Sequence, residues 1–350
     1  MKTLSLYADK IEALKQKFGP SLVIMGHHYQ QDEIMRHVDL AGDSLQLAQM
    51  MDGIDAEHIV FCGVHFMAES AKLLAKPEQK VYLPDMGASC LMAEMVPAQA
   101  LDVVIEKISA HGKKIVPLAY VNTSLAVKAI VGKHGGAVCT SSNAKKMLEW
   151  AYGQGESVLF LPDRNLGNNV GNMLGIAQDK RHTLDVRNNG GNLDYDAIDR
   201  AELIFWDGCC PIHEFFKEEH IAFMRQKYPQ AKIYVHPECP QEIVEKCDGA
   251  GSTSYLIDVA EKARKGDVLI IGTEANLVNR LARVHEKRGV TVIPLFAEAF
   301  CPDMAKITEG LLYKTLEDIA ANKACPVEID GSMVEDAKES LVRMLNHCAK

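Results

Sequence analysis

"SLVIMGHHYQ", residues 21–30, is an apolar run that stops abruptly at polar side chains, and the chain repeats this pattern twice. The counterparts are "KIVPLAYVNTS" at 114–124 and "AKIYVHPECP" at 231–240. Short Val, Ile and Leu runs without alternation are typical of strands that are buried on both faces of a parallel sheet. Three such runs in 350 residues predict three repeats of one structural plan.

Two further elements recur in each third of the chain. The second element is a short apolar run that leads into a helical pattern, at 58–74, 135–151 and 247–263. The third element is another apolar run with a charged exit, at 80–87, 157–167 and 267–277. Strands that alternate with helices predict βαβ units, and hence parallel sheets with right-handed crossovers. The expected fold class is therefore α/β, with three homologous three-layer α/β/α domains.

The repeats also predict the domain boundaries. The first domain is expected at 1–91, the second at 92–210 and the third at 211–304. A stretch rich in Asn, Gly and Asp at 177–202 interrupts the second domain and is interpreted as a surface loop or small insertion. Helical spacing of apolar residues in the last segment, 305–350, predicts an amphipathic C-terminal helix that packs back on the first domain.

Composition argues against several classes of function. A net charge of −9 argues against sequence-independent nucleic-acid binding, which requires dense Lys and Arg surfaces. No apolar run approaches the roughly 20 residues that a bilayer crossing needs, so no membrane role is expected. The N-terminal stretch "MKTLSLYADKIEALKQKFG" carries charges where a secretion signal has its apolar core. It is expected to form a surface helix in a cytoplasmic protein.

Polar side chains follow the first apolar run of every repeat. They are His27, Tyr29, Tyr120, Asn122, His236 and Glu238. In open parallel sheets, ligands gather at the carboxyl ends of the strands, so these side chains are expected to converge on one cavity. Ser141 and Ser252 open later helices, where they suit capping, and helix starts also present free N–H groups to anions.

The ten cysteines include no CxxC pair, the usual mark of structural zinc sites and ferredoxin-type clusters. One cysteine instead follows the last apolar run of each repeat: Cys90, Cys210 and Cys301. Three such thiolates can hold a [4Fe–4S] cluster and leave one iron open as a Lewis acid. Buried cysteines also occur as inert small apolar residues, and the spacing alone leaves that alternative open.

Cys210 has a cysteine neighbour, Cys209, and adjacent residues of an extended strand point to opposite sides. Only one of the two is therefore expected to reach a cluster. Cys210 is the better candidate because Pro211 follows it, as Pro302 follows Cys301.

In their order and spacing, the motifs of this chain resemble those of the quinolinate synthase family over nearly the whole length. They are "GHHYQ", "GDSLQLA", "GVHFMAESAKLL", "YVNTS", "CTSSNA", "PDRNLG", "GCCPIHEF", "YPQAKIYVHPECP", "GSTS" and "AFCPDM". The resemblance implies an enzyme of NAD biosynthesis that condenses iminoaspartate with dihydroxyacetone phosphate to quinolinate, releasing phosphate and water. It also implies a [4Fe–4S] cluster on Cys90, Cys210 and Cys301, at the centre of a pseudo-threefold triangle of domains.

The family's substrate-contacting positions fall on ten residues of this chain. They are His27, Tyr29, Ser44, Tyr120, Asn122, Ser141, His236, Glu238, Ser252 and Thr253. Four of these are expected to be catalytic: Tyr29, Tyr120, His236 and Glu238. Glu238 is expected to approach the open iron, and Tyr29 and His236 to move protons. This chain departs from the family at His28, where relatives often have Asn, and at Cys209, where they often have His or Ala.

Two other functions remain open on the sequence. An aconitase-like hydro-lyase would use the same open iron on a hydroxy acid. A non-catalytic iron–sulfur sensor would bind a small ligand without converting it. A quinolinate synthase, in contrast, is expected to have a functional link to the L-aspartate-oxidising enzyme that supplies iminoaspartate.

Overall fold

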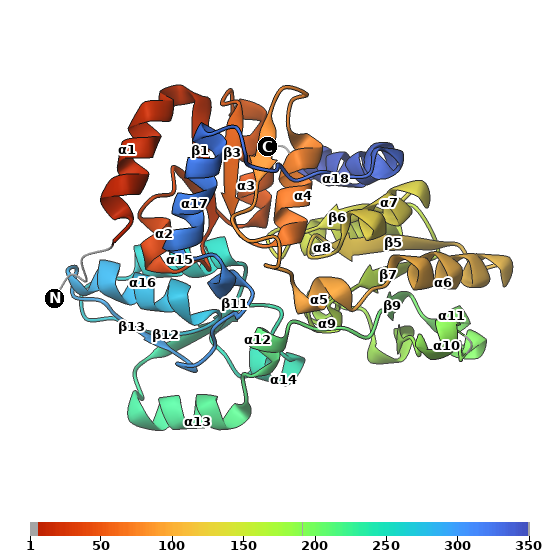
Figure 1. Cartoon of the computed structure of the whole chain (residues 1–350). Coiled ribbons are helices and arrows are strands. Elements are labelled where there is room, and N and C mark those ends of the chain that lie inside the picture. Colours follow the sequence, from red (N-terminus) through yellow and green to blue (C-terminus); the bar gives the residue numbers. More distant parts are fainter. Residues whose placement is uncertain (1–5, 191, 349–350) are drawn as a thin grey trace.

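The computed structural model describes residues 6–190 and 192–348, which form three parallel sheets (Figure 1). The first sheet contains β1 (Leu22–His27), β2 (Leu40–Gly42), β3 (His58–Cys62) and β4 (Lys80–Tyr82). The second contains β5 (Ile115–Tyr120), β6 (Ala137–Cys139), β7 (Ser157–Leu161), β8 (Arg181–Thr183) and β9 (Leu203–Phe205). The third contains β10 (Lys232–Val235), β11 (Gly249–Ala250), β12 (Val268–Gly272) and β13 (Thr291–Pro294). The expected α/β class is confirmed.

Helices connect the strands and cover the sheets. Around the first sheet lie α1 (Ala8–Phe18), α2 (Asp32–Met35), α3 (Ser44–Met50) and α4 (His65–Leu74). The second sheet has α5 (Leu91–Glu94), α6 (Ala98–Ala110), α7 (Leu125–Lys133), α8 (Ala144–Tyr152), α9 (Arg164–Met173), α10 (Arg187–Gly190) and α11 (Tyr195–Arg200). The third has α12 (Pro211–Glu214), α13 (Glu218–Lys227), α14 (Gln241–Glu245), α15 (Thr253–Lys262) and α16 (Ala275–Glu286). The chain ends with α17 (Glu309–Ala320) and α18 (Val334–Cys348).

All three sheets share one strand order. It is β2-β1-β3-β4 in the first sheet, β6-β5-β7-β9 in the second and β11-β10-β12-β13 in the third, with β8 added beyond β9. The three sheets therefore repeat one topology, as the recurring apolar runs predicted. We refer to each sheet with its helices as the first, second and third unit; the domain boundaries at 91/92, 210/211 and 304/305 remain a prediction.

The matching of elements within the first repeat was wrong. The sequence paired 58–74 with 135–151 and 247–263, but β3 and α4 at 58–74 take the topological place of β7–α9 and β12–α16. The true counterpart of β6–α8 and β11–α15 is β2–α3, and 80–87 contains β4, the counterpart of β9 and β13. β2 has only three residues, of which Ala41 is exposed and Leu40 half-buried, so no apolar run marks it.

The stretch 177–202 contains more structure than a surface loop. β8 pairs in parallel with β9 and so extends the second sheet by one strand, and α11 follows it. Leu184 and Ile198 are buried, which ties the stretch to the core. Residue 191 lies outside the described residues, as do 1–5 of the expected N-terminal helix and 349–350 of the C-terminal segment.

The C-terminal segment forms two helices rather than one. α17 lies against α1 and α2 of the first unit, whereas α18 packs mainly on α7 and β6 of the second unit. α18 is the amphipathic helix that the sequence predicted, because Ala337, Leu341 and Met344 are buried. Its place on the second unit differs from the expected place on the first, since helical spacing reveals an apolar face but not its partner.

The core explains how the units are joined. One continuous apolar cluster runs through the first and second units and includes residues of α17 and α18. The third unit has two further clusters, one on each face of its sheet: Ile270 belongs to one and Ile271 to the other. Neighbouring residues of a strand point to opposite faces, so this sheet is covered on both sides.

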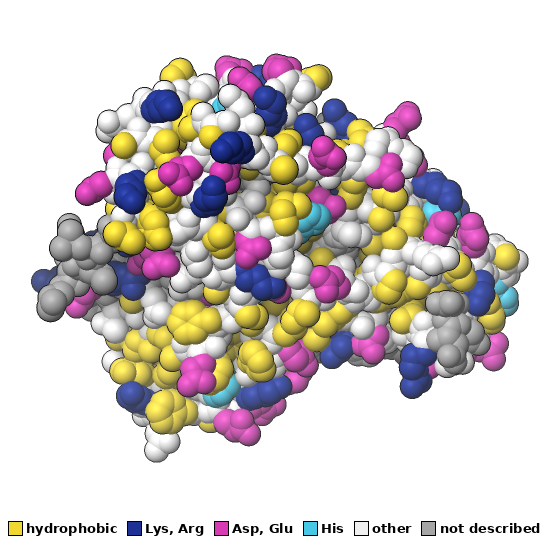
Figure 2. Space-filling view, viewed as in Figure 1, with side chains coloured by type: hydrophobic (Ala, Val, Ile, Leu, Met, Phe, Trp, Pro, Cys, Tyr) yellow, Lys and Arg dark blue, Asp and Glu magenta, His cyan; other side chains and the backbone are white. Residues whose placement is uncertain are grey.

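The surface charges and the helices bear on two functions that the composition argued against, nucleic-acid binding and a membrane role. On the face shown in Figure 2, Lys and Arg side chains are interspersed with Asp and Glu rather than gathered in one patch. Within residues 6–190 and 192–348, none of the helices is both long enough and apolar enough to cross a membrane.

Candidate active site

A cavity of about 370 Å³ lies where strands of all three sheets end. The six strand-end residues that the sequence singled out line this cavity: His27, Tyr29, Tyr120, Asn122, His236 and Glu238. Apolar side chains such as Phe66, Met67 and Met92 complete its wall. These residues converge because they lie at the carboxyl end of the first strand of each sheet, and the carboxyl edges of the three sheets meet.

The strand-end residues form one pair per unit, with the two members two positions apart. In the first and third units, the first member is a buried histidine whose Nδ1 accepts a hydrogen bond from the backbone N–H of the second. The N–H of Tyr29 donates to His27 at 3.2 Å, and the N–H of Glu238 donates to His236 at 3.4 Å. Burial lowers the pKa of both histidines to about 3, so both rings are neutral and carry their proton on Nε2.

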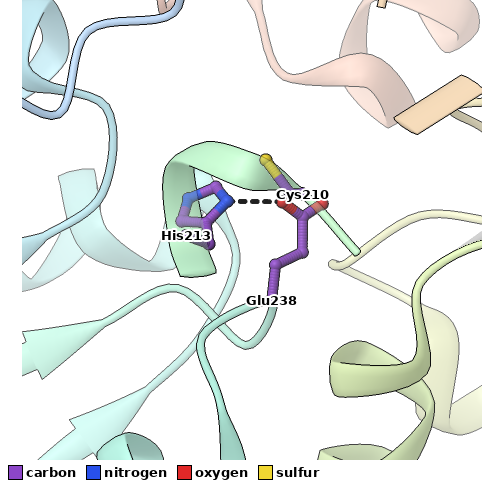
Figure 3. Close-up of side chains that lie close together, drawn as sticks. All are labelled: Cys210, His213 and Glu238. Atoms are coloured by element: carbon purple, nitrogen blue, oxygen red, sulfur yellow. Dashed lines mark ion pairs between the residues drawn. The ribbon is translucent and has the colours of Figure 1, made fainter. Parts of the chain in front are cut away.

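A row of polar groups connects Glu238 to Tyr29. Oε2 of Glu238 lies 2.5 Å from Nδ1 of His213, an ion pair that Figure 3 shows beside Cys210. Nε2 of His213 lies 3.1 Å from the Thr273 hydroxyl, which lies 2.7 Å from the Tyr29 hydroxyl. A buried row of this kind can pass a proton between its two ends, because each neighbouring pair is within hydrogen-bonding distance.

Glu238 is a carboxylate kept charged inside the protein. Burial by itself would raise its pKa, but His213 and His236 beside it and a hydrogen bond with Tyr120 hold the pKa well below its usual value. Burial, followed by the charge of Glu238, raises the pKa of both Tyr29 and Tyr120 well above 10, so both phenols keep their protons. The charged Glu238 carboxylate therefore lies near two neutral phenol groups in the site.

The three cysteines expected to bind a cluster line the same cavity. Cys90 follows β4, Cys210 follows β9 and Cys301 follows β13, which are equivalent strands of the three sheets. All three thiols are free. Cys209 is also half-buried, but it does not line the cavity, and its N–H donates to Sδ of Met95 at 3.5 Å.

The surroundings of the three thiols are alike. Burial raises the pKa of each, to about 12 for Cys90. In each case, the backbone N–H three residues further on acts in the opposite direction, because it donates to the sulfur: Ala93, His213 and Met304. Donor atoms of Cys210, His213 and Glu238 all lie within 4.8 Å of one another, so a group bound at Cys210 has the other two as neighbours.

The serine and threonine residues that line the cavity include three at the starts of helices or in the turns before them. Ser44 and Thr253 are the first residues of α3 and α15, and Ser141 lies in the turn before α8. Ser252, also expected at the site, does not line the cavity, because its side chain accepts a hydrogen bond from the N–H of Tyr255 and caps α15.

The polar residues of this site that the sequence did not single out include His213, Thr273 and Asp43. His213 and Thr273 belong to the row that ends at Tyr29, and Asp43 joins the three units. One oxygen of Asp43 caps α3, and the other accepts hydrogen bonds from the hydroxyls of Ser142 and Ser254. The available signal was position alone: His213 lies three residues after Cys210, and Thr273 directly follows β12.

Three parallel sheets whose carboxyl edges meet at one mostly apolar cavity with a few convergent polar groups are typical of an enzyme of the α/β class. A family model described as "Quinolinate synthetase A protein" matches residues 9–346 of this chain. The quinolinate synthase of Geobacillus sp. (strain WCH70) is 42% identical over 353 residues, which cover 98% of this chain and 95% of the relative. The quinolinate synthase of Bacillus anthracis is 43% identical over 341 residues, or 96% and 92% of the two chains. That of Acidobacterium capsulatum is 39% identical over 342 residues, again 96% and 92%.

The family model matches residues 9–346, the part of the chain that contains every motif on which the resemblance was based. The chain belongs to the quinolinate synthetase A family, and its function is that of a quinolinate synthase in NAD biosynthesis.

Proposed function

We propose that this chain makes quinolinate from iminoaspartate and dihydroxyacetone phosphate, with release of phosphate and water, at a [4Fe–4S] cluster. The observation that carries the proposal is the placement of one thiol from each unit at a single cavity, beside the row that ends at Tyr29. Family membership supports the same reaction.

Cys90, Cys210 and Cys301 are the proposed cluster ligands. They suit the group because all three are free, occupy equivalent positions and have a backbone N–H directed at the sulfur, which favours the thiolate. Three cysteines leave one iron of a [4Fe–4S] cluster without a protein thiolate. When bound, the cluster supplies a Lewis acid that polarises a substrate oxygen.

Tyr29 and the row behind it are proposed to move protons during ring closure. The protonated Tyr29 phenol faces the cavity and acts as an acid, and the Thr273 hydroxyl at 2.7 Å replaces the proton that it gives away. Thr273 in turn exchanges a proton with Nε2 of His213, whose ring is oriented by Glu238 on its other side. His236 donates from Nε2 to a substrate oxygen, and Tyr120 orients the Glu238 carboxylate.

The hydroxyls are proposed to bind the anionic ends of the substrates. Iminoaspartate carries two carboxylates and dihydroxyacetone phosphate carries a phosphate, and helix starts stabilise such anions with their free N–H groups. Ser44, Ser141 and Thr253 line the cavity at such positions, and His27 and Asn122 add donors from the strand ends. Ser252 contributes by capping α15. Because an imine hydrolyses in water, we also infer a functional link to the L-aspartate-oxidising enzyme that supplies iminoaspartate.

Cysteine variants test the proposal. Protein purified without oxygen and reconstituted with iron and sulfide should form quinolinate from the two substrates. Cys90→Ser, Cys210→Ser and Cys301→Ser should each lose the cluster and the activity, because each removes one of three ligands. Cys209→Ser is the matched control and should retain both, since Cys209 does not line the cavity. Iron and sulfide per chain and chromatographic detection of quinolinate measure the outcome.

Other outcomes would favour other functions. If Cys209→Ser loses the cluster and Cys210→Ser retains it, then Cys209 and not Cys210 is the ligand from this pair. Dehydration of citrate-like acids without quinolinate formation would favour the hydro-lyase, and substrate binding without turnover would favour the sensor.

A further inference from the structure

Each cysteine loop is attached to the helix that follows the third strand of its own sheet. The first residue of that helix donates its backbone N–H to the carbonyl oxygen two residues before the cysteine. The three bonds are His65 to Ala88 at 2.7 Å, Arg164 to Gly208 at 2.8 Å and Ala275 to Ala299 at 2.9 Å. The attachment therefore repeats with the topology, although the loop sequences differ.

In the second unit, a buried carboxylate adds a second attachment. Asp163 is the N-cap of α9, and its Oδ1 accepts the N–H of Leu166 at 2.8 Å. Its other oxygen, Oδ2, accepts the backbone N–H of Cys210 at 3.1 Å. The side chain is 0% exposed, so both bonds are protected from water.

The third unit has the same arrangement with a longer side chain. Glu274 is the N-cap of α16, and its Oε2 accepts the N–H of Asn276 at 2.8 Å. Its Oε1 accepts the backbone N–H of Cys301 at 3.3 Å. Glu274 is also 0% exposed. In the first unit the corresponding N-cap is Val64, whose side chain has no polar atom, so Cys90 has no such carboxylate partner.

Helix capping alone does not account for these two acids. A serine caps a helix about as well as an aspartate, and in this chain Ser124 caps α7 and Ser252 caps α15 with one hydroxyl each. Burying a carboxylate is costly unless both oxygens are hydrogen-bonded. A carboxylate differs from a serine in having two acceptor oxygens, and here one holds the helix while the other reaches the cysteine. In Glu274 the oxygen that accepts the Cys301 N–H also accepts the side-chain amide of Asn276 at 2.9 Å.

We propose that Asp163 and Glu274 are positioning residues that aim the side chains of Cys210 and Cys301 into the shared cavity. The bond to the cysteine N–H fixes the peptide plane before the cysteine, and the helix N-terminus fixes the carboxylate. Two of the three sulfurs are thereby held at fixed positions relative to rigid helices, whereas Cys90 is held by backbone contacts. This inference rests on the proposed iron–sulfur site.

The test compares variants that keep the helix cap but lose the second acceptor. Asp163→Ser and Glu274→Ser can still cap their helices, but one hydroxyl cannot also reach the cysteine N–H. Asp163→Glu is the conservative rescue, because a glutamate makes the same two kinds of bond in the third unit. Asp194→Ser is the matched control: Asp194 caps α11 by accepting the N–H of Ala197, away from the cysteines.

The measurements are the rate at which reconstituted protein loses iron to a chelator without oxygen, and the electron paramagnetic resonance spectrum of the reduced cluster. Asp163→Ser and Glu274→Ser should lose iron faster by on the order of 10- to 100-fold, as expected when a partner of a metal ligand is removed. They should also change the spectrum. Asp163→Glu should stay near the wild-type rate, and Asp194→Ser should equal it.

Two results would overturn the inference in distinguishable ways. If both serine variants lose iron at the same rate as Asp194→Ser and have the same spectrum, the inference is overturned. The proposed cluster would still stand. Wild-type protein that takes up no iron and sulfide would overturn the proposed function and this inference with it. If Asp163→Ser does not fold, Asp163→Asn, which has nearly the same shape but one acceptor oxygen, takes its place.

Discussion

At the residue scale, the hydroxyl of Thr273 joins two groups that lie far apart in the sequence. It lies 2.7 Å from the Tyr29 hydroxyl, 244 positions away, and 3.1 Å from Nε2 of His213. Thr273 is 0% exposed and does not line the cavity. A change at this residue therefore alters the proposed proton row without removing a substrate contact.

Thr273→Val keeps the shape of the side chain and removes the hydroxyl. We expect kcat to fall on the order of 10²- to 10⁴-fold, the usual contribution of a positioned acid–base group, with KM little changed. Steady-state kinetics of the reconstituted enzyme measures both constants. Thr315→Val on α17 is the control, because its hydroxyl donates to the Leu311 carbonyl and has no part in the site. An unchanged kcat in Thr273→Val would exclude this hydroxyl from the proton row.

At the element scale, the close packing of α18 on α7 depends on Gly132. A Cβ atom at Gly132 would clash with the backbone oxygen of Asp336 at the start of α18. Arg343 of α18 donates to the carbonyl oxygens of Gly132 in α7 and of Gly136, which lies just beyond the end of α7, at 3.3 and 2.6 Å. α18 thus packs closely on the second unit because Gly132 has no side chain and because the Arg343 guanidinium donates to carbonyl oxygens there.

Gly132→Ala should lower the thermal unfolding temperature. Alanine is a better helix former than glycine by about 1 kcal/mol, but overpacking of a tight contact costs about 1–3 kcal/mol, so we expect a net loss of stability. Differential scanning calorimetry measures the shift. Gly310→Ala in α17 is the control, because the atoms nearest to a Cβ there belong to the Tyr7 side chain, at 3.3 Å or more, and not to backbone. Equal stability of both variants would show that α18 adapts to the extra methyl group.

At the scale of the whole molecule, side-chain amides and a guanidinium join the third unit to the other two. Asn169 of α9 donates to the carbonyl oxygens of Pro237 and Cys239, both at 2.8 Å, and so holds the loop that carries Glu238. From the third unit, Arg280 of α16 donates to the carbonyl oxygens of His28 and Gln30 in the first unit. The cavity is lined by residues of all three units, so its shape depends on contacts between them.

Asn169→Ala should leave two buried carbonyl groups without their donor. We expect a loss of about 1–3 kcal/mol in the free energy of unfolding. We also expect a higher KM, because the residues before and after Glu238 lose their hydrogen bonds to Asn169. Denaturant unfolding and steady-state kinetics measure the two effects. Asn172→Ala, an exposed position on the same helix, should change neither by a comparable amount. An unchanged KM in Asn169→Ala would mean that the loop is held by other contacts.

The sequence revealed those parts of the site that follow directly from apolar runs. Cys210 and Tyr120, for example, come at or just after the end of a buried strand, and the topology of parallel strands brings such positions to one edge. Thr273 occupies a comparable position but was missed, because a threonine at a strand end has many ordinary uses. β2 was missed because three residues, only one of them buried, carry too little hydrophobic pattern.

The amino-acid sequence by itself determined the α/β class, the threefold repetition and the cysteine that ends each repeat. These depend on local properties, since apolar runs form buried strands and capping residues start helices whatever lies elsewhere. Only the tertiary structure decided that Thr273 meets Tyr29, that α18 packs on the second unit and that Asp163 reaches Cys210. Such contacts join residues from different elements, and their formation depends on how the packed elements are placed relative to one another rather than on any local pattern.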